Sequence, residues 1–118
     1  MTRGEVRRLA LALPEATEAP HFAAWSFRVR GKIFATVPPD GGTLHIFVDA
    51  DAVRAAVGAD PASFEELRWG KKLAGVKVSL AAVRQAAVRD LLEASWRARA
   101  PKKVAAAFDA HSDGRARR

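Results

Sequence analysis

Two adjacent lysines, Lys71 and Lys72, stand in the stretch GKKLAG at residues 70–75. The glycines that flank them suit a chain that reverses direction, and the alternating apolar run VKVSL follows at residues 76–80. The pattern predicts that GKKLAG is the exposed tip of a β-hairpin. Two ammonium groups on such a tip can reach phosphates with little loss of hydration, and contacts of this kind give affinity without sequence information.

Other cations occupy similar places in the predicted elements. Arg28, Arg30 and Lys32 lie on the polar side or at the turn of an earlier hairpin, and two basic hairpins on one sheet could flank a duplex as paired wings. The alternative is that all of these residues form ordinary solvated surfaces. The residues that we predict to contact DNA are Arg28, Arg30, Lys32, Arg68, Lys71, Lys72, Lys77, Lys102 and Lys103.

The charge of the chain is unevenly distributed. Residues 1–67 hold 7 Lys and Arg against 9 Asp and Glu, whereas residues 68–118 hold 13 against 4. Such asymmetry indicates a polyanionic partner, nucleic acid before a membrane surface. A solubilising surface in an arginine-rich chain explains the same numbers, so charge alone leaves both interpretations open.

The residue types that carry catalysis or bind metals show no productive spacing. His21, His45 and His111 form no pair at the spacing of a helical metal site. The chain has no cysteine, which excludes disulfides, thiolate metal sites and a cysteine nucleophile. It also has no GxSxG, Walker or GxGxxG motif. We therefore expect a protein that is not an enzyme and that needs no cofactor or metal.

A first hairpin is predicted by the stretch AAWSFRVRGKIFATV at residues 23–37, which alternates around Gly31. A turn of two residues at Arg30–Gly31 would leave the apolar faces mixed. A turn of three residues sets Phe27 opposite Ile33 and separates the faces better, so we favour the longer turn.

The remaining elements follow from capping residues, alternation and helical spacing. The first helix has a capping box of Thr2 and Glu5 and ends before Pro14, and a third strand carries Leu44, Ile46 and Val48, with His45 on its other face. A short helix capped by Asp49 or Asp51 follows, and Asp60–Pro61 predicts another helix start. A long helix covers residues 81–99, and a last short helix carries Val104 and Phe108.

These elements define an α+β fold, with one antiparallel sheet of about five strands and helices packed on one face. The predicted core contains Trp25, Phe27, Ile33, Leu44, Ile46, Val78, Leu91 and Trp96. For Trp69 we favour inward packing with Leu67 over contact with a sugar or base. A single domain is expected over residues 1–110, followed by a basic disordered tail at residues 111–118.

The chain has no apolar run long enough to span a membrane. Its first residues are basic and then apolar, but the apolar part is short and has the spacing of an amphipathic helix rather than a signal peptide. We therefore expect a cytoplasmic protein without a membrane partner.

Four stretches in order along the chain resemble the MmcQ/YjbR-like family of small bacterial proteins: FRVRGKIFA, LHIFVD, WGKKLAGVKVSL and LLEASWRARAPKKVAAAFD. The resemblance covers residues 5–110 approximately. It implies a frataxin/CyaY-like α+β fold and double-wing DNA binding, with no settled enzymatic activity. The family's second hairpin commonly reads Gly-His-Lys-Gly-Trp, whereas Lys71 replaces the His here, and Leu73 and Ala74 replace the Gly-Trp pair. Roles of that His and Trp therefore do not carry over to this chain.

Residues and resemblance together predict a non-catalytic, monomeric protein that binds double-stranded DNA with low sequence specificity through two basic hairpin wings. A protein-interaction module with a basic face remains an alternative. A frataxin-like metal binder is a weaker one, because that activity needs an acidic first helix and this helix carries Arg3, Arg7 and Arg8.

Overall fold

The computed structural model describes residues 1–116, with side chains for residues 1–110. Its elements, in chain order, are α1 (Arg3–Leu11), β1 (Ala16–His21), β2 (Ala24–Val29), β3 (Lys32–Val37), β4 (Thr43–Ile46), α2 (Ala50–Ala59), β5 (Phe64–Trp69), β6 (Lys72–Ser79), α3 (Gln85–Arg99) and α4 (Lys102–Ala116).

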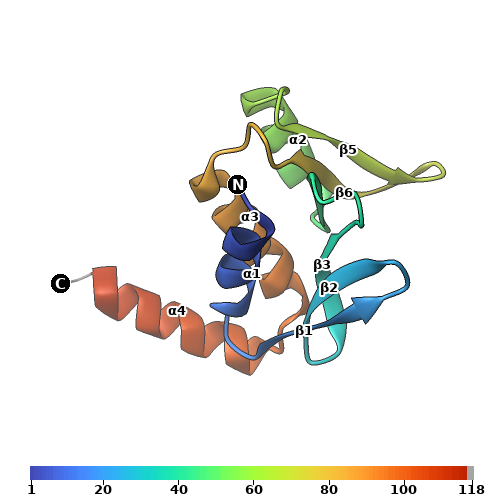
Figure 1. Cartoon of the computed structure of the whole chain (residues 1–118). Coiled ribbons are helices and arrows are strands. Elements are labelled where there is room, and N and C mark those ends of the chain that lie inside the picture. Colours follow the sequence, from blue (N-terminus) through green and yellow to red (C-terminus); the bar gives the residue numbers. More distant parts are fainter. Residues whose placement is uncertain (117–118) are drawn as a thin grey trace.

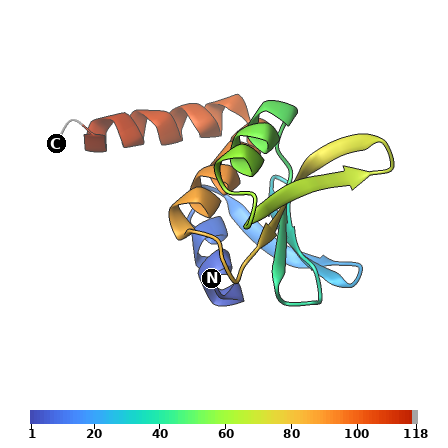
Figure 2. The ribbon, with the colours of Figure 1, turned by 90° about the horizontal axis from the view of Figure 1, so that it is seen from above.

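The strands form one antiparallel sheet in the order β1-β2-β3-β4-β6-β5. Helices gather on one side of this sheet, and two hairpins project from the other side (Figures 1 and 2). The predicted α+β class is confirmed, with six strands in place of about five. The strand missing from the prediction is β1, whose sequence ATEAPH lacks apolar alternation and contains Pro20. Proline is tolerated there because β1 is an edge strand.

The core lies between the sheet and helices α1 and α3. Val6 and Ala10 of α1 and Val88, Leu92 and Trp96 of α3 are buried against the inward side chains of the strands. Of the predicted core residues, Phe27, Leu44, Ile46, Val78 and Trp96 are fully buried, and Trp25 and Leu91 are partly buried against them. The prediction for Leu44 and Ile46 is thus confirmed, with His45 on the opposite face of β4.

The hairpin β2–β3 has a different register from the predicted one. Val29 pairs with Lys32, so the turn contains only Arg30 and Gly31, and both have positive φ, at 50° and 79°. This conformation is that of a type I′ turn, which matches the twist of the flanking strands. A β-bulge follows, because the pairing shifts and sets Phe27 opposite Ala35.

The bulge, rather than a third turn residue, keeps the apolar residues of β3 on the core face. The predicted pairing of Phe27 with Ile33 is therefore wrong. Ile33 pairs with Arg28 and lies on the helix-free face of the sheet, outside the core.

The hairpin β5–β6 is also tighter than predicted. Trp69 pairs with Lys72, so the turn is Gly70–Lys71 and residues 72–75 already belong to β6. Gly75 serves close packing rather than a turn, because a Cβ there would lie 2.2 Å from the carbonyl oxygen of Ile46. The predicted helix start at Asp60–Pro61 is a turn that leads into β5.

The helix ends follow their capping residues. The capping box of α1 is confirmed, and Asp49 caps α2 by accepting a hydrogen bond from the Ala52 amide at 2.9 Å. Helix α4 runs to Ala116 and is longer than the short helix expected. The domain limit at residue 110 and the tail at residues 111–118 stay predictions, and residues 117–118 lie outside the described part. In that part, no helix has the length and apolar character needed to cross a membrane.

Candidate nucleic-acid interface

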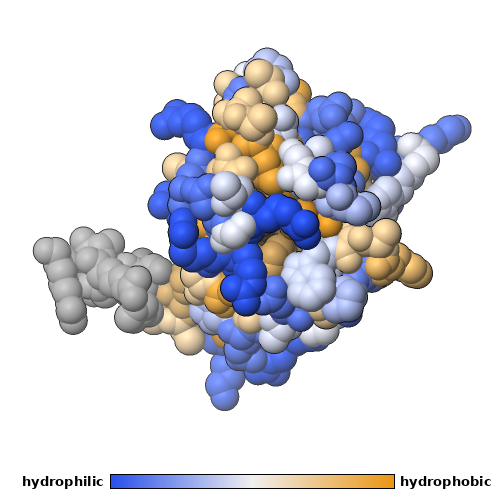
Figure 3. All heavy atoms as spheres, in the orientation of Figure 1, coloured by the Kyte–Doolittle hydropathy of each residue, from blue (hydrophilic) through white to orange (hydrophobic). Residues whose placement is uncertain are grey.

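Two hairpins project from the helix-free side of the molecule (Figures 1 and 2). We name them the β1–β2 wing, residues 16–29, and the β5–β6 wing, residues 64–79. Their tips differ in chemistry, since hydrophilic atoms end the β5–β6 wing and apolar atoms end the β1–β2 wing (Figure 3). Phe22, in the turn of the β1–β2 wing, is 95% exposed.

The tip of the β5–β6 wing presents Lys71 and Lys72 to solvent. Arg68 holds the turn, because its Nε donates to Glu66 Oε1 at 2.9 Å and its Nη1 donates to the Lys71 carbonyl at 3.1 Å. Within the described residues, neither lysine has a carboxylate within 4.0 Å. Their two ammonium charges are therefore available to an external anion, as the sequence predicts for an exposed tip.

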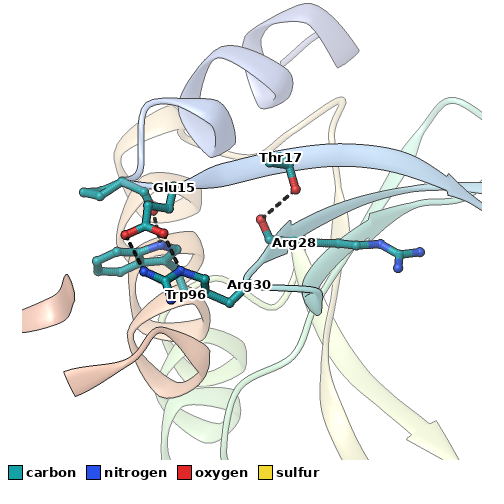
Figure 4. A network of polar contacts seen from close by, with 6 residues as sticks. Glu15, Thr17, Arg28, Arg30 and Trp96 are labelled. Carbon is teal, nitrogen blue, oxygen red and sulfur yellow. Dashed lines mark hydrogen bonds and ion pairs between the residues drawn. The ribbon is translucent and has the colours of Figure 1, made fainter. Parts of the chain in front are cut away.

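The other predicted tip, at Arg30, does not form a wing. The guanidinium of Arg30 forms an ion pair with Glu15, and its Nη2 donates to Glu15 Oε2 at 3.1 Å (Figure 4). Arg30 and Glu15 line a groove together with Pro14, Lys103 and Phe108, so the β2–β3 turn faces helix α4 across this groove. Hydrogen bonding to Arg30 lowers the pKa of the Glu15 carboxyl, and the partner raises the pKa of Arg30. The interpretation of β2–β3 as a projecting basic hairpin is corrected, and the wing on this side is β1–β2.

The remaining predicted cations are dispersed. Arg28 lies on the helix-free face of β2, where its Nε donates to Ser26 Oγ at 3.0 Å, and it points away from the pair of Arg30 and Glu15 (Figure 4). Lys77 is 3.6 Å from Glu65 across β5–β6. The exposed residues Lys32, Lys102 and Lys103 lie at the start of β3 and of α4. The structure thus brings Lys71 and Lys72 together at one tip, beside Arg68, and separates this group from Arg28, Arg30, Lys32, Lys102 and Lys103.

Between the wings lies a cavity of about 410 Å³, which we name the inter-wing pocket. Residues of β1, β2, β3, β4 and β6 line it, together with Trp69, Phe47 and Arg99. No Asp or Glu is among the lining residues of the described chain, whereas Lys72 and Arg99 contribute positive charge. The sequence does not predict this pocket, because its residues come from segments far apart in the chain.

Arg99 enters the pocket from the end of α3. Its Nη1 donates to the carbonyls of Phe47 and Ser95, at 3.1 and 3.0 Å, and to Ser95 Oγ at 3.2 Å. The buried Ser95 hydroxyl also lies 2.6 Å from the Phe34 carbonyl, so the network connects α3 to β3 and to the end of β4. Burial lowers the pKa of the Arg99 guanidinium, although arginine remains charged in proteins. The small polar Ser95 one helical turn before Arg99 was the signal available in the sequence.

Trp69 is not a core residue, contrary to the interpretation that we favoured. Its side chain is 57% exposed, and its ring lies 5.3 Å from that of Phe47 in a tilted arrangement. Leu67 is buried, whereas Trp69 pairs with Lys72 directly beside the turn and lines the pocket. The alternation of apolar residues alone therefore does not show that this tryptophan lies outside the core.

His45 forms part of the pocket and is half-buried. Burial lowers the pKa of its imidazole, and the nearby charge of Lys77 lowers it further, while Asp40 opposes the shift. In the part of the chain that the structure describes, no three His, Cys, Asp or Glu side chains group so as to hold a metal ion.

The fold is that of an α+β protein with a six-stranded antiparallel sheet, helices on one face and two hairpins that project from the other. The family model of YjbR matches residues 11–98, and the chain belongs to the YjbR family. The resemblance seen in the sequence is thereby confirmed.

Among solved structures, the chain is similar to the crystal structure of Deinococcus radiodurans protein DR2400, which has a DUF419 domain. The TM-score is 0.69, with 23% identity over 81% of this chain and 76% of that chain, and this likeness shows a shared fold alone. No curated protein matches the chain.

Proposed function

We propose that this protein is a non-catalytic, monomeric binder of double-stranded DNA with low sequence specificity. The observation that carries the proposal is the pair Lys71 and Lys72 on the projecting tip of the β5–β6 wing, with no carboxylate within 4.0 Å among the described residues. Ammonium groups placed in this way neutralise phosphates and release counterions, irrespective of the base sequence.

The hairpin that carries the two lysines holds the tip in a fixed conformation. The guanidinium of Arg68 donates hydrogen bonds to Glu66 and to the Lys71 carbonyl. It therefore stabilises the turn and does not compete with the lysines for the phosphate. A fixed turn reduces the ordering that binding would otherwise require. Arg28 lies on the same helix-free face and is proposed as a further phosphate contact.

Six of the predicted contacts have a smaller part in this proposal. Arg30, Arg68 and Lys77 are ion-paired with Glu15, Glu66 and Glu65 respectively. Lys32, Lys102 and Lys103 lie away from the β5–β6 tip and are proposed to attract DNA only at long range.

The test is a salt titration of duplex binding, measured by fluorescence anisotropy on two labelled duplexes of unrelated sequence. Replacing Lys71 and Lys72 by Ala should weaken both complexes equally and lower the slope of log K against log salt by about 2, since each phosphate contact contributes roughly 0.9. The matched control is Arg3→Ala with Arg8→Ala, which removes two charges from the exposed face of α1 on the helix side.

The control pair should leave the slope nearly unchanged. Equal slopes for the lysine variant and the wild type would remove Lys71 and Lys72 from the interface. If the wild type bound no duplex even at about 50 mM salt, the protein-interaction module with a basic face would become the better explanation.

A further inference from the structure

The inter-wing pocket has the size and the composition of a ligand site. Its volume of about 410 Å³ falls within the range of roughly 300–1,000 Å³ that small-molecule sites occupy. Apolar side chains form much of the wall, and the charged groups among its described lining residues are all basic. This combination selects an anion that also carries an apolar group.

Arg99 supplies the anion-binding group. Its Nη1 is held by backbone carbonyls and Ser95, so the side chain is already positioned before any ligand arrives. Its Nε and Nη2 donate no hydrogen bond to the described residues, and no carboxylate of those residues lies within 4.0 Å. A half-buried guanidinium without a counter-charge binds an oxyanion strongly, because the charge has already lost part of its hydration.

The contrast with Arg97, on the same helix, shows that this state is specific to Arg99. Arg97 forms ion pairs with Asp109 at 2.6 Å and with Glu93 at 3.4 Å, and its pKa is raised mainly by the hydrogen bond to Asp109. Arg99 has only carbonyl and hydroxyl partners, and its guanidinium lies 5.8 Å from the Phe47 ring centroid. Thus Arg97 has carboxylate partners within the protein, whereas Arg99 has none among the described residues and faces the pocket.

Trp69 supplies a flat surface. The indole is 57% exposed, leans against Phe47 and lines the pocket, while Lys72 directly opposite in the hairpin brings an ammonium group to the same pocket. An exposed indole held in this way offers a stacking face for a planar ring. Ring and anion sites thus lie within one pocket.

We propose that the inter-wing pocket binds a nucleotide, with its base stacked on Trp69 and its phosphate held by Arg99 and Lys72. The nucleotide can be free, or it can be one unit of a single strand, since both present the same base and phosphate. The inference goes beyond the proposed contact with duplex phosphates, because Arg99 and Trp69 lie in the pocket whereas Lys71 lies at the wing tip.

The experiment titrates the full-length protein with AMP, adenosine, inorganic phosphate and a short oligo(dT), using tryptophan fluorescence and calorimetry. AMP should bind at one site, and adenosine and phosphate should each bind at least about tenfold more weakly, because each lacks one of the two recognised groups. Trp69→Ala and Arg99→Met should each reduce AMP affinity by about tenfold or more.

Three variants keep the test interpretable. Arg97→Met, on the same helix but outside the pocket, should leave AMP affinity unchanged. Trp69→Ala alters an exposed side chain, so it remains informative if Arg99→Met disturbs folding. Lys71→Ala, measured alongside, should weaken duplex binding but leave AMP affinity unchanged, and this separates the pocket from the wing tip.

AMP binding that is lost with Trp69→Ala would support a free nucleotide as ligand. Binding of oligo(dT) alone, with the same loss, would support a nucleotide unit within a strand. Absence of binding by both probes, affinity for phosphate equal to that for AMP, or unchanged affinity in folded Arg99→Met and Trp69→Ala would overturn the proposal.

Discussion

Gly75 shows how one missing Cβ shapes this sheet. The carbonyl oxygen of Ile46 and the Cα of Phe47 would lie 2.2 and 2.9 Å from a Cβ at position 75. These obstacles are backbone atoms, so a rotamer change cannot relieve the clash. Close approach at this position allows β6 to pass the end of β4, where Phe47 turns toward Trp69 and the inter-wing pocket.

Gly75→Ala should therefore destabilise the protein by about 1–3 kcal/mol, the range for an overpacked buried position. The measurement is urea denaturation followed by circular dichroism. Gly58→Ala is the matched control, because it lies in helix α2 with no atom within 4 Å of the added Cβ. It should stabilise the protein by about 0.5–1 kcal/mol through helix propensity. A neutral Gly75→Ala would show that β6 can move away from β4.

His45 should make stability depend on pH. Its folded pKa is lowered, first by burial and then by Lys77, against the opposing charge of Asp40. The unfolded chain therefore binds the proton more readily than the folded chain. The stability that neutral His45 contributes is complete above the unfolded pKa of about 6.5 and is lost as the pH falls through the folded pKa. Lys72 and Arg99 also line this pocket and add to its positive charge.

The check compares urea midpoints of the wild type and His45→Gln between about pH 7.5 and pH 5. Over this interval the wild type should lose more stability than the variant, because glutamine does not titrate. The same loss in both proteins would place the pH sensitivity elsewhere.

At the scale of the element, the β1–β2 wing is the part that the sequence did not predict. Strand β1 is polar and sits at the sheet edge, where Pro20 discourages pairing with another chain. The turn that follows holds Phe22 at a positive φ of 55°, with its ring edge-on to His21 at 4.7 Å. An apolar side chain on a projecting tip resembles the wedges that some DNA-binding proteins insert between base steps.

Phe22→Asn should weaken duplex binding by roughly threefold or more, because it removes an apolar contact from the wing tip. Stability should change little, since the side chain is 95% exposed and asparagine tolerates positive φ. Ala23→Asn, at the neighbouring exposed position, is the control for a polar change at this turn. Anisotropy measures binding and thermal denaturation measures stability. If both variants bound DNA like the wild type, the β1–β2 tip would lie outside the interface.

Local rules predicted the elements whose signals are local. The capping box at Thr2 and Glu5 and the inward placement of Leu44 and Ile46 depend only on nearby residues, and both predictions are confirmed. The predicted register of β2–β3 is wrong because β3 contains a bulge, which the alternation of residues does not reveal. The bulge keeps the apolar side chains on the core face, an effect that the prediction had attributed to a longer turn. Alternation along β5 likewise does not show that Trp69, which lies beside the turn, is exposed.

The candidate site was predictable only in part for the same reason. An exposed lysine pair between glycines can be recognised from its neighbours. Arg99 becomes a pocket residue only through the Phe47 carbonyl, 52 residues away in the chain, and Arg30 is engaged by Glu15, 15 residues away. Contacts between residues so far apart in the chain form only when the sheet is complete. The sequence therefore did not indicate which cations would lack a partner among the described residues.

At the scale of the whole molecule, distance decides whether the cations act together. The longest extent of the described chain is 38 Å, whereas salt screens charges beyond about 8 Å at physiological ionic strength. Helix α4, which begins at Lys102, starts away from the tip of the β5–β6 wing in both views (Figures 1 and 2), so the lysines of the tip and those of α4 act as separate sites. The net charge of +7 overstates the field that a single phosphate experiences at either place.

Trp96 fixes the order in which this protein can be completed during synthesis. Its buried indole donates to the Pro14 carbonyl at 2.9 Å, across 82 residues of sequence. The N-terminal residues leave the ribosome long before α3 does. Until α3 follows, they lack the tryptophan that packs against them in the core. A nascent chain that stops after β6 already contains every strand but lacks the side chain that seals them, and it exposes apolar surface to chaperones. The core is therefore complete only when α3 has been synthesised and has packed onto the sheet.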